Sequence, residues 1–231
     1  MRKNAIVTGA SGNLGKAVVK MLLKADYKVI GTVLTGELSD ENEKHPNFEK
    51  YTLDLSDQKA TEAFIHYTSK KFEHIHFSAL LVGGFGMNNF EDTTLDEIHK
   101  MFRLNFESAF LISQQIYKHL KKQKKGGKIL FVGAKPAIEK RASSGLTAYA
   151  LSKTLVIKLA EHINSEGASH NISASVIVPS IIDTPENRKA MPDADFSQWV
   201  SPDQIANACL FIADDVSTPL RDVVLKVYGQ S

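Results

Sequence analysis

Short runs of apolar, largely β-branched residues alternate along the chain with longer segments in which apolar residues recur every three or four positions. The first run covers residues 5–7, and Leu14, Val18 and Leu22 follow it at helical spacing. The run at residues 75–82 is apolar almost throughout, as expected for a strand that is buried on both faces. Further strands are predicted at residues 28–33, 50–53, 128–132, 172–178 and 223–227.

Helices are predicted between these strands. They cover residues 57–72, 95–120 and 148–166, and a last one begins at Pro202. Regular alternation of strand and helix is typical of a parallel sheet with helices on both faces. We therefore predict one α/β domain over residues 1–231, with a Rossmann-type, doubly wound parallel sheet of about seven strands. The proline-containing stretch 180–200 is predicted to be irregular.

Three glycines separate the first predicted strand from the first predicted helix. Here Gly9 would form the turn, Gly12 would let backbone N–H groups approach a phosphate, and Gly15 would let the helix pack on the strand. The helix N-terminus adds partial positive charge. Glycines can also serve a tight turn alone, but their place after the first strand of an α/β chain favours a dinucleotide site. The other predicted cofactor contacts in this loop are Ser11, Asn13 and Leu14.

Two further positions bear on the cofactor. Asp54 follows the third predicted strand, where a carboxylate can accept from an adenine amino group or can serve as a turn residue; both interpretations stay open. A chain that binds NAD usually carries Asp or Glu at the end of the second strand, bound to the ribose 2′-hydroxyl. Val33 and Leu34 stand there, Glu37 follows later, and no Arg or Lys is placed for a 2′-phosphate. The choice between NADH and NADPH therefore stays open.

Tyr149 and Lys153 are four residues apart in a predicted helix and so share one face. An ammonium beside a phenol favours the phenolate, so we expect Lys153 to lower the pKa of Tyr149. A tyrosine in that position can pass a proton to a substrate oxygen or nitrogen while hydride moves. The lysine can also reach ribose hydroxyls.

With these features in place, the chain resembles the short-chain dehydrogenase/reductase family over nearly its full length. The resemblance implies an oxidoreductase that uses NADH or NADPH, with Tyr149 and Lys153 as catalytic residues and Asn105 holding a water in the proton relay. It also implies nicotinamide contacts from the Ile182 backbone and from Thr184. The matching positions are the glycine loop, Asp54, Gly83 after the fourth strand, Asn105, Tyr149, Lys153 and the segment from Pro179 to Thr184.

One position departs from the family. A serine that binds the substrate carbonyl usually follows the fifth strand, but Gly133 and Ala134 stand there. Ser143 and Ser144 are nearer to Tyr149 and are predicted to lie on a loop. The chain has either lost catalysis, and is a dinucleotide-binding regulator, or acts on a substrate that does not need the hydroxyl.

The dihydropteridine reductase branch of the family lacks this serine, and three segments resemble it: "GGFG", "GAKPAIE" and residues 183–199. This resemblance implies hydride transfer to a small, pterin-like substrate with tyrosine as the proton donor. A carbonyl, imine or quinone substrate is the alternative. Segment 183–199 is predicted to be a substrate lid. The predicted substrate contacts are Phe85, Lys135 and Trp199, for each of which ordinary packing is the alternative.

Composition limits the partners and the location. The net charge of +2 is too small to indicate a nucleic-acid or membrane partner, and the lysines of 118–128 are typical of a solvated helix end. The single cysteine, Cys209, cannot form an internal disulfide. No stretch reaches the roughly 18 apolar residues of a membrane span, and no secretory signal is evident. We expect a cytoplasmic protein with no metal site. The family resemblance implies a homodimer or homotetramer formed through the helices at 95–120 and 148–166.

Overall fold

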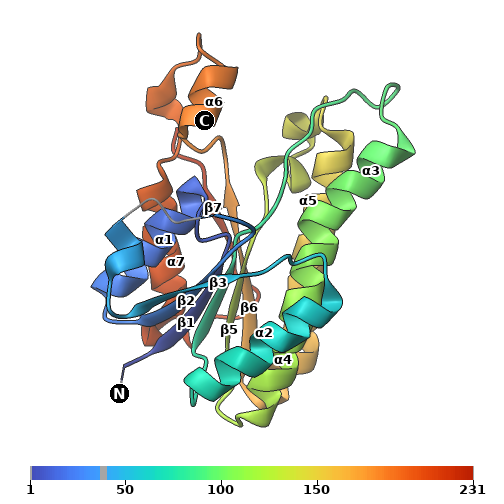
Figure 1. Cartoon of the computed structure of the whole chain (residues 1–231). Coiled ribbons are helices and arrows are strands. Elements are labelled where there is room, and N and C mark those ends of the chain that lie inside the picture. Colours follow the sequence, from blue (N-terminus) through green and yellow to red (C-terminus); the bar gives the residue numbers. More distant parts are fainter. Residues whose placement is uncertain (1, 37–40, 231) are drawn as a thin grey trace.

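The computed structural model describes residues 2–36 and 41–230 of the chain (Figure 1). Seven strands form one sheet in the order β3-β2-β1-β4-β5-β6-β7 within this described part, and all neighbouring strands are parallel. The predicted doubly wound sheet is confirmed. The strands are β1 (Asn4–Thr8), β2 (Lys28–Val33), β3 (Phe48–Thr52), β4 (Phe77–Leu80), β5 (Gly127–Val132), β6 (Ile172–Pro179) and β7 (Val224–Val227).

Helices cover both faces of the sheet because successive strand residues point to opposite sides. Ile6 of β1 packs in the apolar layer beneath α2 (Gln58–Lys71), α4 (Ser108–Lys122) and α5 (Thr147–Gly167). Its neighbours Ala5 and Val7 pack in the other layer, beneath α1 (Asn13–Lys24) and α7 (Pro202–Ala213). Figure 1 shows these two groups of helices on opposite sides of the sheet. Among the described residues, no helix combines the length and apolar character that crossing a bilayer requires.

The strand order reverses at β1, which pairs with β2 on one side and with β4 on the other. In open sheets of this kind, ligands bind in the crevice outside the carboxyl ends of the strands at such a reversal. The loop that begins at Gly9 follows β1, and the segment that contains Gly83 follows β4. The topology therefore brings these two segments to one crevice.

The predicted helix over residues 95–120 is continuous but not regular. It consists of α3 (Leu95–Met101), a π-helical turn (Phe102–Glu107) and α4. Such turns interrupt the regular hydrogen-bond ladder and are frequent at functional sites.

The stretch predicted to be irregular, residues 180–200, contains α6 (Pro185–Ala190) and a 3₁₀ turn (Phe196–Gln198). The helix begins at this point because the Thr184 hydroxyl accepts from the Asn187 N–H and because proline is favoured at a first helical position. The segment predicted as a lid is therefore partly helical.

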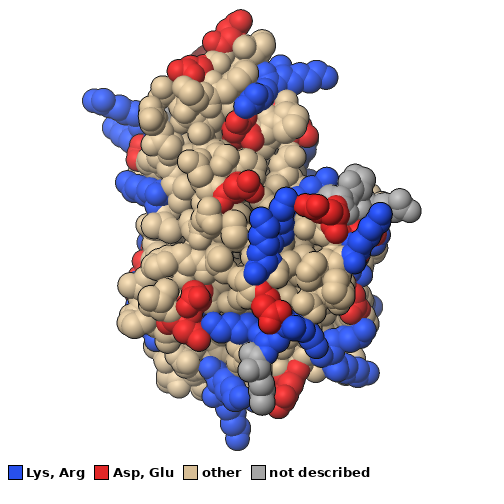
Figure 2. All heavy atoms as spheres, turned by 90° about the vertical axis from the view of Figure 1, so that its left-hand side faces the viewer, with Lys and Arg blue, Asp and Glu red and all other residues tan. Residues whose placement is uncertain are grey.

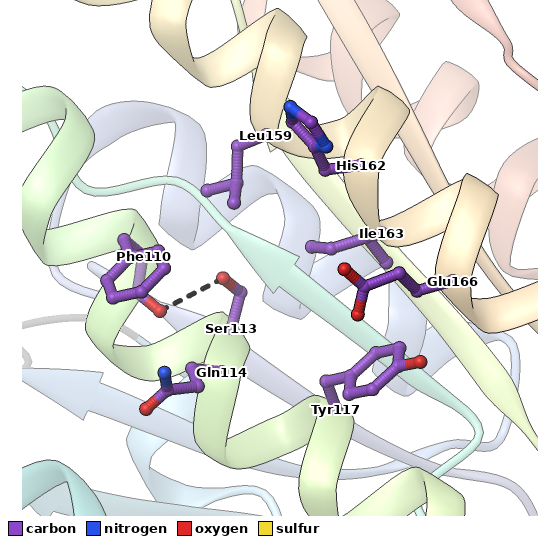
Figure 3. A pocket seen from close by; sticks show the side chains of 8 residues that line it. All are labelled: Phe110, Ser113, Gln114, Tyr117, Leu159, His162, Ile163 and Glu166. Atoms are coloured by element: carbon purple, nitrogen blue, oxygen red, sulfur yellow. Dashed lines mark hydrogen bonds between the residues drawn. The ribbon is translucent and has the colours of Figure 1, made fainter.

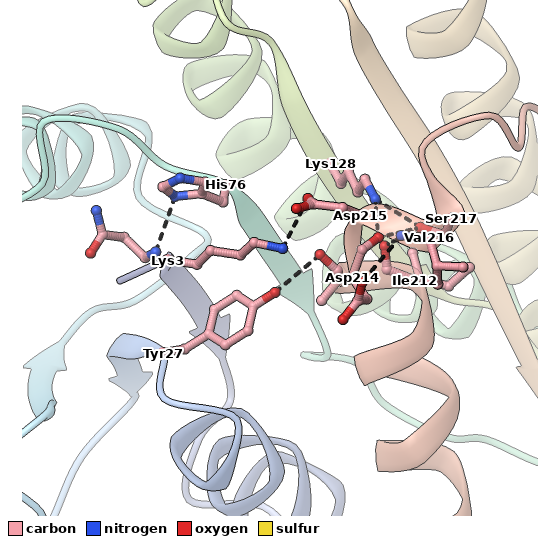
Figure 4. A network of polar contacts seen from close by, with 11 residues as sticks. Lys3, Tyr27, His76, Lys128, Ile212, Asp214, Asp215, Val216 and Ser217 are labelled. Atoms are coloured by element: carbon pink, nitrogen blue, oxygen red, sulfur yellow. Dashed lines mark hydrogen bonds and ion pairs between the residues drawn. The ribbon is translucent and has the colours of Figure 1, made fainter. Parts of the chain in front are cut away.

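A network of polar contacts lies at the amino ends of the strands (Figure 4), whereas the crevice beside Gly9 and Gly83 lies at their carboxyl ends. Lys3 pairs with Asp215 at 2.9 Å, Tyr27 donates to the carbonyl oxygen of Ala213 at 3.0 Å, and Lys128 donates to the Ser217 hydroxyl at 2.8 Å. These contacts anchor the end of α7 to the sheet. On the face that carries α1 and α7, Lys and Arg side chains are interspersed with Asp and Glu (Figure 2).

Candidate active site

The glycine loop is compact because its residues approach one another too closely for side chains. Gly9 has a left-handed backbone with φ of +69°, and its carbonyl oxygen accepts from the Gly12 N–H at 3.0 Å. A Cβ on Gly15 would lie 2.0 Å from that same oxygen, so Gly15 lets α1 pack on the loop, as predicted.

The outer side of the loop has room for a ligand. A Cβ on Gly12 would have one neighbour within 4 Å, the Gly9 carbonyl oxygen at 3.4 Å. Gly12 is the N-cap of α1 and provides no side-chain cap for its first N–H groups. Ser11 and Asn13 are exposed and Leu14 is half-buried. Free N–H groups beside open space fit a phosphate. The contacts predicted for these residues stay predictions.

Asp54 serves as a turn residue. Its carboxylate accepts from the Ser56 N–H at 2.9 Å and from the Ser56 hydroxyl at 2.7 Å, and these bonds lower its pKa. The carboxylate is nevertheless exposed at the carboxyl end of the sheet, and its adenine contact stays a prediction. At the end of β2, Val33 is buried and Leu34 is 62% exposed. Glu37 lies outside the described residues.

Asn105 joins the π-helical turn to the segment after β4. Its Oδ1 accepts from the Gly84 N–H at 2.9 Å, and its Nδ2 donates to the Gly84 carbonyl at 3.1 Å and to the Ser152 hydroxyl at 3.0 Å. A Cβ on Gly83 would lie 2.5 Å from Asn105 Oδ1 and 3.0 Å from Lys153 Nζ. The structure thus brings Gly83, Asn105 and Lys153 together, and Gly83 must lack a side chain for this approach.

Lys153 is buried, with 6% of its surface exposed. Its ammonium donates to the Val132 carbonyl oxygen, at the end of β5, at 2.9 Å. Burial lowers the pKa of Lys153 from 10.5 to about 8, since desolvation penalises the charged form. An ammonium has three N–H donors, so the bond to Val132 leaves donors for a ligand hydroxyl.

Tyr149 of α5 lies beside an aromatic ring from the segment that follows β4. The ring of Phe85 meets it edge to face, with centroids 5.0 Å apart, and Phe85 itself is 62% exposed. Burial raises the pKa of Tyr149 to about 12. The expectation that Lys153 lowers this pKa is therefore wrong for the chain alone. Desolvation by burial is the cause of the shift, and the Lys153 ammonium is engaged by the Val132 carbonyl.

No hydroxyl occupies the position after β5 where the family has its serine. Ala134 is buried, and the Gly133 N–H donates to the Ile177 carbonyl at 2.8 Å. Ser143 lies in a short 3₁₀ turn and donates to the Lys140 carbonyl at 2.8 Å, within its own turn. The departure seen in the sequence is thus not compensated by Ser143.

Two of the three predicted substrate contacts are engaged by the protein itself. The Lys135 ammonium lies 4.8 Å from the centroid of the Tyr228 ring and 3.9 Å from the Glu139 carboxylate. Trp199 is only 7% exposed and packs against Phe196 with ring centroids 4.8 Å apart. Both side chains thus have the packing roles that were the alternative, and their substrate contacts stay predictions. Phe85 is the one of the three that is largely open.

The segment after β6 has a fixed local structure. Pro179 ends β6, and the Ile182 carbonyl accepts from the Asn187 side chain at 2.8 Å. Farther along, Arg188 makes a bidentate pair with Asp183 at 2.5 and 2.7 Å. Such forked pairs hold a guanidinium in one orientation. The carboxamide contacts predicted for Ile182 and Thr184 stay predictions.

Several contributors to this site were not indicated by sequence patterns. They are backbone groups or side chains that act across long sequence separations: Val132, Ser152 and Glu186, the last of which accepts from Asn13 at 2.7 Å. All three lie in or directly beside segments singled out in the sequence, since Ser152 precedes Lys153, Val132 precedes "GAKPAIE" and Glu186 falls within residues 183–199, but the spacing gave no sign of their partners.

A separate cavity of about 270 Å³ lies between α4 and α5 (Figure 3). None of the predicted site residues lines it. Its wall includes Phe110 and Tyr117 from α4 and His162 and Glu166 from α5. This cavity and the group formed by Gly83, Asn105 and Lys153 are therefore different places, and we assign the chemistry to the latter because the predicted residues meet there.

Comparisons with known proteins agree with this geometry. Residues 3–195 match the family model described as short chain dehydrogenase. The chain is 30% identical to dihydropteridine reductase of Dictyostelium discoideum, over 89% of this chain and 85% of that protein. It is 28% identical to 2-dehydro-3-deoxy-D-gluconate 5-dehydrogenase of Pseudoalteromonas atlantica, over 98% and 94% of the two chains.

Among solved structures, ElxO with NADP bound superposes with a TM-score of 0.90 at 23% identity, covering 99% of this chain and 98% of that chain. This likeness establishes the fold, and the family match covers most of the sequence. The chain belongs to the short-chain dehydrogenase/reductase family and is an NAD(P)-dependent oxidoreductase.

Proposed function

We propose that this oxidoreductase uses NADH or NADPH to reduce a small, flat, pterin-like substrate such as a quinonoid dihydropterin. The proposal is supported by a site in which Tyr149 and Lys153 share α5 and Asn105 bonds to Ser152 of the same helix, but in which Ala134 stands where a carbonyl-binding hydroxyl would be. Similarity to a dihydropteridine reductase supports it.

When bound, the nicotinamide would supply hydride, that is, two electrons and one proton, to an electron-poor carbon or nitrogen centre of the substrate. Tyr149 supplies the proton that completes the reduction at a ring nitrogen. Its raised pKa keeps the phenol protonated at neutral pH, which is the form a donor needs. The tyrosinate that remains is reprotonated from solvent, so the balance is one hydride and one proton for each substrate reduced.

The other residues position these groups. Lys153 presents its remaining N–H donors beside Gly83, where they can bind ribose hydroxyls. Asn105 fixes the segment after β4 through both atoms of its amide, and its oxygen keeps a lone pair that can accept from a relay water. Phe85, whose ring meets that of Tyr149 edge to face, provides an apolar surface beside the tyrosine.

A heteroaromatic substrate suits this arrangement for a chemical reason. A carbonyl gains much from a second hydroxyl donor that stabilises the developing oxyanion. A quinonoid pterin is already electron-poor and needs a proton on nitrogen, so a single donor is sufficient. A carbonyl, imine or quinone is the second candidate, which the similarity to a sugar-acid dehydrogenase favours.

The test is a steady-state assay of NADH and NADPH oxidation with quinonoid dihydropterin, beside a panel of aldehydes, ketones, imines and quinones. We expect the pterin to have the highest kcat/KM by at least about tenfold, the effect of one well-placed hydrogen bond on a transition state. The Ala134→Ser variant is the matched control, because the restored hydroxyl should raise the rate with ketones and leave the pterin rate nearly unchanged. A ketone preferred by the wild type would refute the pterin proposal.

We also propose that the chain forms a homodimer or homotetramer through α4 and α5. Support comes from the partly apolar cavity between these helices and from Phe110, which is 39% exposed beside it. Exposed aromatic side chains that line a hollow are typical of association surfaces. Light scattering on the wild type and on Phe110→Glu tests this: we expect the variant to be monomeric.

A further inference from the structure

The carboxylate of Glu186 connects the segment 183–199 to the glycine loop. Its Oε2 accepts a hydrogen bond of 2.7 Å from Nδ2 of Asn13. Asn13 is the first residue of α1, and Glu186 is the second residue of α6, so the bond joins elements that lie far apart in the sequence. Figure 1 shows α6 beyond the carboxyl end of the sheet, on the side of α1.

A second residue also favours the ionised form of Glu186. The N–H of Glu186 itself, the Asn13 side chain and the Thr184 hydroxyl together lower the pKa of this carboxyl, so it is ionised at neutral pH. Asn13 and Thr184 are both predicted to contact the cofactor, one at the phosphate side and one at the nicotinamide side. An anion that belongs to the protein therefore engages groups expected on both sides of the crevice.

Electrostatics favours an anion at this place. The first N–H groups of α1 receive no side-chain cap from Gly12, and its first turn contains no acidic residue. A helix N-terminus with free N–H groups attracts negative charge. Glu186 brings a negative charge to the side chain of the first residue of this helix, beside the loop where the phosphate is expected.

We propose that Glu186 is an internal competitor of the dinucleotide: it bonds to Asn13 in the free enzyme and must leave when the cofactor binds. This rests on the cofactor placement in the proposed function. Two consequences follow. Cofactor affinity is lower than the glycine loop alone would provide, and α6 is released from α1 only after the dinucleotide has bound.

The first test measures Kd for NADH and NADPH by fluorescence titration without substrate. The proteins are the wild type, Glu186→Gln, which removes the charge, and Glu186→Ala, which removes the charge and the bond. We expect both variants to bind about 3- to 10-fold more tightly, as for loss of one exposed, charge-assisted contact. The factor should be the same from pH 6 to 8, because the carboxylate is ionised throughout.

The control is Asp193→Asn. Asp193 is an exposed carboxylate of the same segment for which the described residues show no hydrogen bond or ion pair. Asp193→Asn removes the same charge as Glu186→Gln, so we expect its Kd for the cofactor to stay within about twofold of the wild-type value. Equal tightening by Asp193→Asn would mean that general repulsion, not the Asn13 contact, sets the affinity, and it would overturn the proposal.

The second test reports on α6 directly. Arg188 and Lys189 are exposed on this helix and are trypsin sites. Without cofactor, we expect Glu186→Ala to be cleaved there faster than the wild type, because α6 loses its bond to α1. Unchanged or weaker cofactor binding by both Glu186 variants overturns the proposal, and equal cleavage overturns the release of α6. A protein that shows both effects yet does not reduce pterins refutes the substrate proposal alone.

Discussion

Replacement of the buried lysine by an apolar residue should make the protein more stable and inactive at the same time. Lys153 sits in a site that desolvates its ammonium and provides the Val132 carbonyl as its protein partner for a hydrogen bond. Methionine has a similar length and no charge. The Lys153→Met variant therefore removes a cost of burial while it removes the group that binds ribose and accompanies Tyr149.

The magnitude follows from the pKa. A fall from 10.5 to about 8 means that the folded state binds the lysine proton about 3 kcal/mol more weakly than the unfolded chain does. The variant leaves the Val132 carbonyl without this donor, which costs about 1 kcal/mol. We expect a net gain of about 2 kcal/mol in the free energy of unfolding at pH 7, or an increase of about 4–8 °C in Tm for a chain of this size.

The pH dependence identifies the cause. Below pH 8 both states of the wild type hold the proton, and the full penalty is present. Between about pH 8 and 10.5 the folded state has lost a proton that the unfolded state still binds, so wild-type stability rises with pH. The advantage of Lys153→Met should shrink over this interval and be lost near pH 10.5. Tyr149, whose pKa is raised, stabilises both proteins below pH 10 and cancels in the difference.

Urea unfolding of both proteins at several pH values between 7 and 10.5 measures this difference, and cofactor oxidation measures activity. We expect turnover to fall by about 100-fold or more, as for loss of a group in a proton-transfer system. A variant less stable than the wild type at pH 7, with a difference that does not change with pH, would show that the ammonium is not buried at a cost, and the reasoning would fail.

Three further predictions concern single positions. Gly12→Val should fold with a Tm close to that of the wild type yet bind NADH at least about tenfold more weakly, because its side chain enters open space where the phosphate is expected. Gly15→Val should not fold, since its Cβ would lie 2.0 Å from the Gly9 carbonyl oxygen. Circular dichroism and cofactor titration separate the two variants, and normal NADH affinity in Gly12→Val would contradict the assignment of the loop to the phosphate. Tyr149→Phe should lower turnover at least about tenfold and leave cofactor Kd nearly unchanged, and an undiminished rate would exclude the proton-donor role. The Cys209 thiol is fully buried, which raises its pKa to about 12, so a thiol reagent at pH 8 should modify it only after unfolding; rapid modification of the native protein would contradict this.

Local patterns were sufficient for the architecture. Burial on both faces makes a parallel strand a short apolar run, and helices must expose one side, so their apolar residues recur at helical spacing. For this reason β2 (Lys28–Val33) and α5 (Thr147–Gly167) lie where the pattern predicted them, within a residue or so. The glycine loop was also predictable, because the steric demand on Gly15 is set by residues within the same short segment.

The chemistry of the site depended on contacts that no local pattern contains. The spacing of Tyr149 and Lys153 placed both on one helix face, but burial decided the direction of the tyrosine's pKa, and the Val132 carbonyl that engages Lys153 comes from β5. The π-helical turn carries Asn105, whose partners Gly84 and Ser152 lie 21 and 47 positions away.

Lys135 and Glu186 illustrate the same limit. Lys135, which follows β5, lies over the ring of Tyr228, which follows β7, and Glu186 of α6 accepts from Asn13 of α1. Sequence determines which groups are present and on which element each lies, because hydrophobic periodicity and glycine sterics are local. Solvation and partner choice are decided by the tertiary structure, since they depend on what other strands and helices bring within hydrogen-bonding distance and on how much water they exclude.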